Sequence, residues 1–581
     1  MNYQLITTAN ESTWPDPAVP ILFLGEWCKL YSRKRKWEEY SFKTLDYHWK
    51  QKGKLYNDYI YLDNLYERLL IEVTENLNSI HFENESVEYW RIIIGPWLGY
   101  FIQMVWDRYE SLRLAFETNS IEKVWVFTIN EVDTVANDMD DFYRFFVSDF
   151  WNQWIFQEII KQKYPEVLIT KNIIIGFPKV RVKNSGSIFR VVIKKVFNWI
   201  SSLNASSDSY FFISDYLGKD SAKIQLRLKQ IPKRFVEKPN PDFKFSKEIR
   251  DRIKFTQVRN DFEVIISELI PKQIPKSYIE GYVEIKEHPL TRRWPKSPKA
   301  IFTSNSHIGY DVFKVWAAIQ KSKGSKLILS QHGGHYGIGK FSFHEDHETK
   351  IADRYLTWGW TNAEKINVIP SVCVKYGNKK HIEWNPRGKA LLVENSVPRY
   401  SYWMYSATQS TRVLDYLNDQ FSFVSNLDSQ IQENLSVRLY PQDYGWEHKL
   451  RWKDRFPNLE ISGNGNTMNE LIKASRVFVS TYNATTFLES LSLGIPTLIF
   501  WNPDDWQIRN SAKPYFQKLE ELGIFFQSPS ECARELNRIW DNIEDWWFEP
   551  KRQRVVSDFL NQYAKKSDQF VEEIIKHIQV S

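Results

Sequence analysis

The sequence predicts an α/β protein with two Rossmann-like domains that face a central cleft, and with a helix-rich elaboration at the N-terminus. Three observations lead to this expectation. The chain has 581 residues, which is too long for one hydrophobic core. From residue 299 onward short apolar runs alternate with segments of helical period, and the same alternation starts again at residue 388. Strands that alternate with helices through short loops form a parallel sheet flanked by helices.

The first predicted domain covers residues 1–207 and mixes strands with long helices. Residues 18–28 ("AVPILFLGEWC") and 122–129 ("EKVWVFTI") are expected to form strands. Residues 86–117 carry apolar side chains at spacings of three and four, which predicts a long helix that is interrupted near Pro96. This region is therefore expected to be α/β with a large helical share.

The second predicted domain covers residues 208–387. It begins with a strand at 208–218, and the lysine-rich residues 219–254 are expected to form an exposed connection. The regular part of this domain consists, in order, of a strand at 299–305, a helix at 310–324, and strands at 325–330 and 353–360.

The third predicted domain covers residues 388–581 and closes with helices from Pro529 onward. Its expected strands are 388–396, 435–441, 458–465, 476–482, 495–501 and 523–528. Ligands of such folds bind outside the carboxyl ends of the strands, so we expect a binding cleft between the second and third domains.

The composition indicates a globular protein without a nucleic-acid partner. A net charge of +6 is mild for this length, and acidic residues are nearly as common as basic ones. Aromatic residues make up 16% of the chain, and we expect core packing for most of them, although such residues also suit sugar-stacking surfaces. Cys28, Cys373 and Cys532 lie far apart, which argues against a disulfide scaffold or a zinc site.

The sequence favours a cytoplasmic protein that is at most peripheral to a membrane. It has no basic-then-apolar signal at its start and no run of about 18 apolar residues. Between Glu166 and Asp208 there is no acidic residue, but there are seven lysines and arginines. Residues 171–200 could therefore form an amphipathic helix on the cytoplasmic face of an anionic inner membrane, or equally a solvated helix face that packs on its neighbour.

The first of three polar clusters follows the strand at 325–330. Imidazole moves protons near neutral pH, and glycines let the backbone turn tightly beside a ligand. We interpret His332 as a catalytic base, or as a group that stabilises a leaving phosphate; the alternative is a structural histidine held by a backbone carbonyl. The cluster consists of Gln331, His332, Gly333, Gly334 and His335.

The second cluster surrounds the turn after the strand at 435–441. Arg438 could bind a phosphate or a carboxylate, or it could form a structural ion pair. The cluster consists of Arg438, Tyr440, Pro441, Gln442 and Asp443.

The third cluster stands at the start of a predicted helix after the strand at 476–482. A helix N-terminus offers free N–H groups and the positive end of a dipole, and hydroxyls beside it complete a phosphate cradle. Ordinary N-capping is the alternative, but the number of polar side chains exceeds what one cap needs. The cluster consists of Ser480, Thr481, Asn483, Thr485 and Thr486.

The order of these clusters resembles that of GT-B glycosyltransferases, and among them of CDP-glycerol glycerophosphotransferases and bacterial sialyl- and Kdo-transferases. This resemblance implies that His332 is the base and that Arg438, Tyr440 and Pro441 form the nucleotide-binding turn. It also implies that the phosphate is bound by Ser480, Thr481 and Thr485. Glu489 would contact the ribose. Tyr440 stands where those families have histidine, which is a departure from their pattern.

Longer stretches resemble a family of transferases encoded in bacterial O-antigen, capsule and other surface-polysaccharide gene clusters. They include "PILFLGEWCKLYSRK", "YWRIIIGPWLGY", "SQHGGHYG", "RLYPQDYGW" and "STYNATTFLESLSLGIPTLIFW". The resemblance draws attention to Glu26, Asp107 and Arg108 as residues of the acceptor side, with Glu26 and Asp107 as further catalytic candidates.

These observations predict a glycosyltransferase that moves a sugar from a nucleotide donor to a lipid-linked or oligosaccharide acceptor of a surface polysaccharide or lipopolysaccharide. The resemblance favours a CMP-linked donor such as a nonulosonic acid or a Kdo-like sugar. We expect no cofactor and no metal ion, because no Asp-x-Asp motif stands at a predicted strand end and "DMDD" (138–141) is interpreted as a solvated helix start. The alternatives are a nucleotide-sugar epimerase and a non-catalytic scaffold of glycan assembly.

Overall fold

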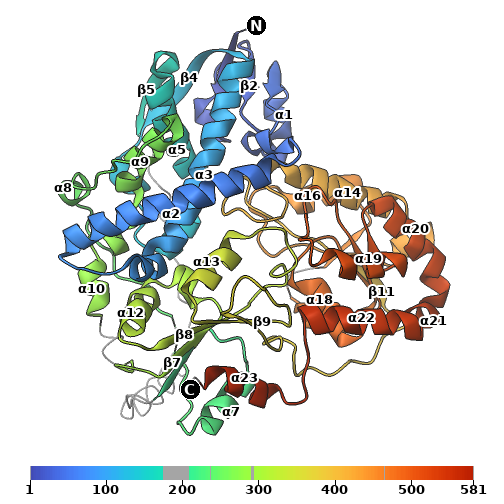
Figure 1. Cartoon of the computed structure of the whole chain (residues 1–581). Coiled ribbons are helices and arrows are strands. Elements are labelled where there is room, and N and C mark those ends of the chain that lie inside the picture. The colour runs from blue at the N-terminus through green and yellow to red at the C-terminus, as the bar shows by residue number, and fades with distance from the viewer. Residues whose placement is uncertain (1, 175–208, 236, 289–293, 463–464, 580–581) are drawn as a thin grey trace, which may run out of the picture.

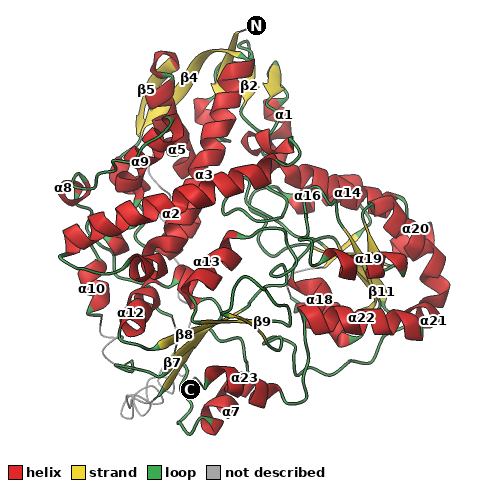
Figure 2. Cartoon of the chain, in the orientation of Figure 1, coloured by secondary structure: helices red, strands yellow, loops and turns green. Residues whose placement is uncertain are grey.

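The computed structural model describes residues 2–174, 209–235, 237–288, 294–462 and 465–579. They form three parallel β-sheets with helices around them (Figures 1 and 2). The N-terminal sheet lies at the top of Figure 1, the middle sheet at the bottom and the C-terminal sheet at the right. Most of the basic segment 171–200 lies outside the described residues.

The N-terminal sheet has the strand order β3-β2-β1-β4-β5, and every neighbouring pair is parallel. A first strand in the middle, with strands added on both sides, is the doubly wound order of a Rossmann-like unit. The region that we expected to be α/β with a large helical share contains a complete parallel sheet. Its strands are β1 (Asn2–Ile6), β2 (Ile21–Phe23), β3 (Phe42–Thr44), β4 (Ser120–Thr128) and β5 (Leu168–Ile174).

Two long helices, α2 (Lys54–His81) and α3 (Val87–Thr118), run from this sheet toward the middle domain (Figure 1). The predicted interruption near Pro96 is wrong, because α3 continues through this residue. Proline inside a helix costs about 3 kcal/mol, which tight packing here offsets. A Cβ atom on Gly99 would lie 2.0 Å from the ring of Phe343, so the helix backbone itself touches the middle domain.

The middle sheet has the order β10-β9-β8-β7-β6 and is also parallel throughout. Helix α12 (Asp311–Ser322) packs on α3, and α13 (Phe343–Ile351) contacts both α3 and β9. The strands are β6 (Tyr210–Ile213), β7 (Ala300–Thr303), β8 (Lys326–Ser330), β9 (Arg354–Thr357) and β10 (Val368–Pro370).

The C-terminal sheet has the order β13-β12-β11-β14-β15-β16 and is parallel. The chain reverses its direction of strand addition between β11 and β14, and crevices for ligands form at such switch points. Its strands are β11 (Lys389–Val393), β12 (Leu435–Arg438), β13 (Glu460–Ser462), β14 (Ser475–Ser480), β15 (Thr497–Phe500) and β16 (Phe525–Phe526). Its helices include α14 (Val413–Ser425), α16 (His448–Arg455), α17 (Met468–Ala474), α18 (Thr485–Leu493), α19 (Lys513–Glu521), α20 (Pro529–Ile539) and α22 (Pro550–Tyr563).

The last helix, α23 (Phe570–Ile578), returns to the middle domain and packs beside α7 (Asp220–Arg227) (Figure 1). Phe570, Ile574 and Ile578 form a separate apolar cluster with residues of the middle sheet, among them Phe212 and Ile328. The predicted range of the third domain therefore includes a helix that completes the second. Helix α7 also corrects the expectation that residues 219–254 are only an exposed connection.

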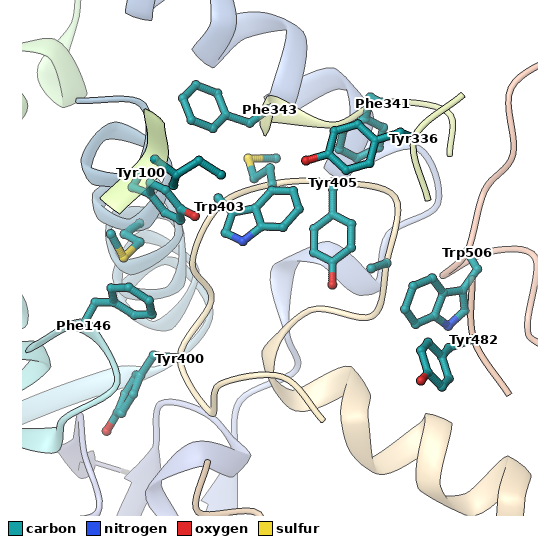
Figure 3. Close-up of a cluster of buried hydrophobic side chains, with 14 of the residues drawn as sticks. Tyr100, Phe146, Tyr336, Phe341, Phe343, Tyr400, Trp403, Tyr405, Tyr482 and Trp506 are labelled. Atoms are coloured by element: carbon teal, nitrogen blue, oxygen red, sulfur yellow. The ribbon is translucent and has the colours of Figure 1, made fainter. Parts of the chain in front are cut away.

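Aromatic side chains fill the space where the three domains meet, as Figure 3 shows. Trp403 stacks between His344 and Tyr405, with ring centroids 4.0 Å apart on each side. Tyr100 of α3 lies beside His344, and Trp506 of the C-terminal domain lies beside Tyr405. One continuous core thus links the three sheets, and it confirms the expectation that most aromatic residues serve core packing.

The predicted α/β fold with two parallel-sheet domains that face each other, the GT-B arrangement, is confirmed. Carboxyl ends of strands from the middle and C-terminal sheets meet, because the turn after β8 touches the start of the helix after β14. Within the described residues, no helix combines the length and the apolar character that a membrane crossing requires.

The packing of α23 generates a stability prediction. Replacing the fully buried Ile574 by alanine should cost about 2–5 kcal/mol, because it leaves a cavity against the outer face of the middle sheet. Urea-induced unfolding measures this change. Lys576→Ala on the exposed side of the same helix is the matched control, and equal effects of the two substitutions would contradict the assigned packing.

Candidate active site between the middle and C-terminal domains

The turn after β8 is held by its own first residue. The amide of Gln331 donates to the carbonyl oxygen of Gly333 at 2.7 Å, and its side-chain oxygen accepts from the backbone N–H of Trp358 and the indole N–H of Trp360. Gln331 is fully buried. The side-chain amide of Gln331 thus holds the shape of the turn, and its assignment as a nucleotide ligand stays a prediction.

His332 lies against a buried carboxylate on α13. Its Nδ1 is 3.6 Å from Oε1 of Glu348, and the hydroxyl of Tyr336 lies 3.3 Å from its Nε2 while donating to the same carboxylate at 2.8 Å. Burial lowers the pKa of His332 to about 4, so the imidazole is neutral at pH 7. Burial raises the pKa of Glu348 to about 7. The pair is an imidazole that can accept a proton and a carboxylate that can stabilise the cation formed.

Four more histidines surround this pair at positions 307, 335, 344 and 347. Burial lowers the pKa of His307 and His335 to about 3, and it lowers the pKa values of His344 and His347 far below the usual range. The ring of His335 is tilted by 35° against that of Tyr336, with 4.2 Å between their centroids, and its Nε2 lies 3.4 Å from the hydroxyl of Ser342. His335 thus packs within the turn, and its assignment as a nucleotide-sugar ligand stays a prediction.

His332, His344 and Glu348 hold three possible metal ligand atoms within 4.8 Å of one another. Two neutral imidazoles and a carboxylate are a donor set that zinc accepts. The hydroxyl of Tyr100 lies 2.6 Å from Nε2 of His344, and Tyr336 donates to Oε1 of Glu348, whereas Nδ1 of His332 and Oε2 of Glu348 have no hydrogen-bond partner among the described residues. The three side chains can act as an acid–base group, and the expectation that no metal ion takes part stays a prediction.

The start of α18 faces the His332 turn across the interface between the domains. The backbone N–H of Gly334 donates to the hydroxyl of Thr485 at 3.1 Å, and a Cβ atom on Gly334 would lie 2.4 Å from the carbonyl oxygen of Ala484. The N-cap residue of α18 is Ala484, so no side chain caps the helix. The capping explanation for this polar cluster is therefore wrong, and the first N–H groups of the helix are left to another partner.

Asn483 points to that partner. It is fully buried, and neither its amide nitrogen nor its side-chain oxygen has a hydrogen-bond partner. A buried amide without a partner is costly, so such a group calls for an explanation, and a bound ion or water is one. An anion at the start of α18 would accept from the amide nitrogen and from the helix N–H groups, while the amide oxygen needs a separate donor.

Three hydroxyls of the predicted cradle are tied up inside the protein. Ser480 donates to the carbonyl oxygen of Tyr482, and Thr481 donates to that of Val393 at 2.9 Å. Thr486 donates to the hydroxyl of Tyr482 at 3.0 Å. Ser480, Thr481 and Asn483 are all buried, and Thr485 lies against the His332 turn. The assignment of Ser480 and Thr481 as phosphate ligands stays a prediction.

The second cluster borders a cavity of about 230 Å³ at the carboxyl ends of β11, β12 and β13. Tyr440 and Pro441 line the cavity, and Gln442 is exposed beside them. Asp443 also lines it, but its carboxylate accepts from three backbone N–H groups, of Gly445, Glu447 and His448, and thereby shapes the turn. Arg438 is buried at the end of β12.

A buried pair on the wall of this cavity was missed by the sequence interpretation. His448 bonds through Nδ1 to Glu394, which also accepts from the indole N–H of Trp452 at 2.7 Å. Burial lowers the pKa of His448, but the Glu394 carboxylate outweighs it, so the pKa lies above its ordinary value. Glu394 directly follows β11, and a charged residue directly after a predicted strand is the sequence feature that could have identified it. No comparable sequence feature identifies His448.

Lys375, after β10, was also missed. Its Nζ lies 4.7 Å from the ring centroid of Tyr216, and the described residues contain no carboxylate within salt-bridge distance of it. Burial lowers its pKa, and its charge in turn lowers the pKa of His332. A cation is thus available on the same side of the cleft as the candidate base. No motif surrounds this lysine in the sequence.

The remaining predicted residues lie away from the turn. Asp107 accepts from Tyr47 at 2.6 Å and pairs with His48 and Arg108, which in turn donates to Ser401. Asp107 and Arg108 are buried, and their charges join the N-terminal domain to the loop that carries Trp403. Their assignment to the acceptor side stays a prediction.

Two predicted carboxylates have lysine partners. Glu26, on the short helix Glu26–Cys28 after β2, pairs with Lys29 at 2.9 Å. Glu489, in the second turn of α18, pairs with Lys379 at 3.3 Å. Neither forms a hydrogen bond or ion pair with His332 within the described part of the chain.

The buried histidines generate a prediction on stability and pH. His347 is buried, and both of its ring nitrogens lack partners. The pKa of His347 is lower in the folded than in the unfolded state, so below about pH 6.5 the unfolded state binds one more proton than the folded state. The free energy of unfolding of the protein therefore decreases as the pH falls below this value. The free energy of unfolding of His347→Phe minus that of the wild type should therefore increase by about 1.4 kcal/mol when the pH is lowered from 6 to 5.

Denaturant unfolding at several pH values measures this slope. His347→Gln is the control, because it removes the same titration and should show the same pH dependence at a different absolute stability. A difference between His347→Phe and the wild type that does not change with pH would contradict the assignment of a neutral buried imidazole.

Comparison with known proteins assigns the chain to a family. No curated protein matches the sequence. Solved structures with distant similarity include TarM, with 13% identity, 48% of this chain and 54% of that chain covered, and a TM-score of 0.31. MurG from Acinetobacter baumannii has 12% identity, 66% and 95% coverage and a TM-score of 0.31. S. aureus MnaA in complex with UDP has 11% identity, 64% and 96% coverage and a TM-score of 0.36.

The chain spans about half the length of TarM. The model of the LIC12162 family of transferases matches residues 3–578, which is nearly the whole chain. The resemblance to a transferase family is thereby confirmed. The protein belongs to the LIC12162 family of transferases.

Proposed function

We propose that this protein is a glycosyltransferase that moves a sugar from a nucleotide donor to a surface-glycan acceptor. One observation carries the proposal: the turn with the candidate base His332 touches the uncapped start of α18, through Gly334 and Thr485 at 3.1 Å. A proton acceptor and an uncapped helix start thus lie at one point of the cleft, an arrangement that suits inverting transfer from a sugar phosphate.

On this proposal the donor phosphate binds at the start of α18. The helix N–H groups and the amide of Asn483 donate to it, and the Lys375 ammonium offsets part of its charge. The nucleoside occupies the cavity of about 230 Å³ that Tyr440, Glu394 and His448 border.

In an inverting reaction His332 would take the proton of the attacking acceptor hydroxyl. The acceptor oxygen bonds to the anomeric carbon, the bond from that carbon to the phosphate oxygen breaks, and the nucleotide leaves with the electron pair. Glu348 stabilises the imidazolium so formed, at 3.6 Å from Nδ1. In a retaining reaction the same imidazole would only stabilise the phosphate.

The finer assignment is a CMP-linked donor of the nonulosonic acid or Kdo class. Its support is the resemblance of the turn and helix-start clusters to CDP-glycerol glycerophosphotransferases and to sialyl- and Kdo-transferases. Tyr440 replaces the histidine of those families. The acceptor is proposed to be lipid-linked or oligosaccharide, at the cytoplasmic face of the inner membrane, with residues 171–200 as a peripheral contact.

The donor site predicts a nucleotide-specific stabilisation. In a thermal-shift panel of CMP, CDP, UDP, GDP and dTDP, CMP should raise the melting temperature, by an amount that corresponds to about 2.7 kcal/mol at a hundredfold excess over Kd. Asn483→Ala should remove this shift while the protein stays folded, because the amide has no partner in the protein.

Thr467→Ala is the matched control. Thr467 caps the helix α17 of the same domain, so its loss should lower stability without changing the nucleotide shift. A shift by another nucleotide would overturn the CMP assignment alone, and no shift by any nucleotide would overturn the donor site.

The catalytic pair generates a kinetic prediction. His332→Ala should lower kcat by a factor on the order of 10²–10⁴, because the attacking hydroxyl loses its proton acceptor. Glu348→Gln should lower kcat less and should remove the acid limb near pH 7 that protonation of Glu348 produces in the wild type. Nucleotide release from the donor identified in the panel measures both, and the nucleotide shift shows that each variant keeps its donor site.

An unchanged kcat in His332→Ala would contradict the role of His332 and favour the scaffold alternative. Release of a free or epimerised sugar without any requirement for an acceptor would favour the epimerase alternative.

A further inference from the structure

We infer that a second cavity, on the other side of the His332 turn, binds a sugar ring of the acceptor, and that this ring is uncharged or carries an amino group. The cavity lies between the start of α4 (Met139–Phe146), residues 237–240 and the turn after β7. Its role as an acceptor site rests on the proposed function, but its ability to bind a sugar can be tested by itself.

The position of the cavity connects it to the candidate base. His344 lines the cavity, and its ring centroid is 6.4 Å from that of His332. The donor-side contact of the same turn is made by Gly334, toward α18. A ligand in the cavity would therefore approach His332 from the middle and N-terminal domains, while a donor at α18 would approach from the C-terminal domain.

The size and the walls of the cavity suit a sugar. Its volume of about 410 Å³ lies within the range of about 300–1,000 Å³ that small-molecule sites have. Tyr143 and Tyr310 supply aromatic surface for the apolar face of a ring, and Asn240 and Asn305 supply amides for its hydroxyls.

Two polar atoms of lining residues, the side-chain oxygen of Asn240 and the hydroxyl of Tyr310, have no hydrogen-bond partner among the described residues. The side-chain oxygen of Asn240 is buried and accepts no hydrogen bond, whereas its nitrogen donates to Asp138 at 3.0 Å. An acceptor atom held in this way fits an O–H or N–H donor of a ligand. Asp138 thereby orients Asn240, and it also caps α4. The "DMDD" stretch is thus part of a cavity wall as well as a helix start.

The charge of the lining selects among sugars. Asp138, Asp140 and Glu237 contribute three carboxylates, and Lys238 contributes one ammonium group. Phosphate and carboxylate groups would be repelled here, whereas hydroxyl and ammonium groups would be attracted. A phosphate-bearing part of the acceptor must therefore lie outside this cavity, and the ring inside it is neutral or cationic.

Saturation-transfer NMR with three probes tests the inference: N-acetylglucosamine is neutral, glucosamine is cationic and glucuronic acid is anionic. Asn305→Trp fills the cavity, and Asp140→Lys reverses an exposed charge at its mouth. Asp558→Lys is the matched control. It makes the same charge change at an exposed position of α22 in the C-terminal domain.

The inference predicts signals for N-acetylglucosamine and glucosamine that fall about tenfold in Asn305→Trp, which corresponds to a tenfold loss of affinity. Asp140→Lys should weaken glucosamine and admit glucuronic acid, and Asp558→Lys should behave as the wild type. The thermal unfolding and the nucleotide shift of each variant show that it is folded with its donor site intact.

The inference is overturned if no probe binds the wild type, if glucuronic acid binds as well as the other two, or if both cavity variants bind as the wild type does. If a nucleotide raises the melting temperature but no sugar binds, the inference on this cavity is refuted and the proposed donor site stands. If a sugar binds but no nucleotide raises the melting temperature, the cavity remains a sugar site and the proposed function is refuted.

Discussion

The close approach of Gly334 to the start of α18 is the constraint on which the rest of the site depends. No side chain fits there, since a Cβ atom would lie 2.4 Å from the carbonyl oxygen of Ala484. Only glycine lets the two backbones meet, and their contact brings the His332 turn to a helix start that no residue caps. The two halves of the site therefore come from separate sheets and function only while the domains keep this relative position.

The packing around the site maintains that position. Trp403 lies beside Tyr405 where the three domains meet (Figure 3), and its other face stacks on His344. The buried charges of Asp107 and Arg108 anchor the same loop through Ser401. Burial also keeps the imidazole of His332 neutral, so the packing that positions this candidate base tunes its protonation as well. On the proposed function, stability and catalysis thus rest on the same buried groups.

Much of the fold and part of the site could be predicted from the sequence. Strand–helix alternation predicted the middle and C-terminal sheets, and polar residues after strands marked both sides of the cleft. Periodicity does not reveal which sheet a helix covers, so the return of α23 could not be foreseen. Nor does it show where a side chain at a strand end points: Thr481 turns inward to Val393, while Asn483 is left without a partner. Glu348 and Lys375 join the site only through tertiary contacts, which no local pattern encodes.

The central claim is that the His332 turn and the start of α18 form one donor site. A crystal structure of the protein with CMP tests it most directly. The account predicts a phosphate at the first N–H groups of α18, within hydrogen-bond distance of the Asn483 amide, and a nucleoside in the cavity beside Tyr440. A nucleotide bound elsewhere, with Asn483 still unpaired and α18 uncovered, would contradict it.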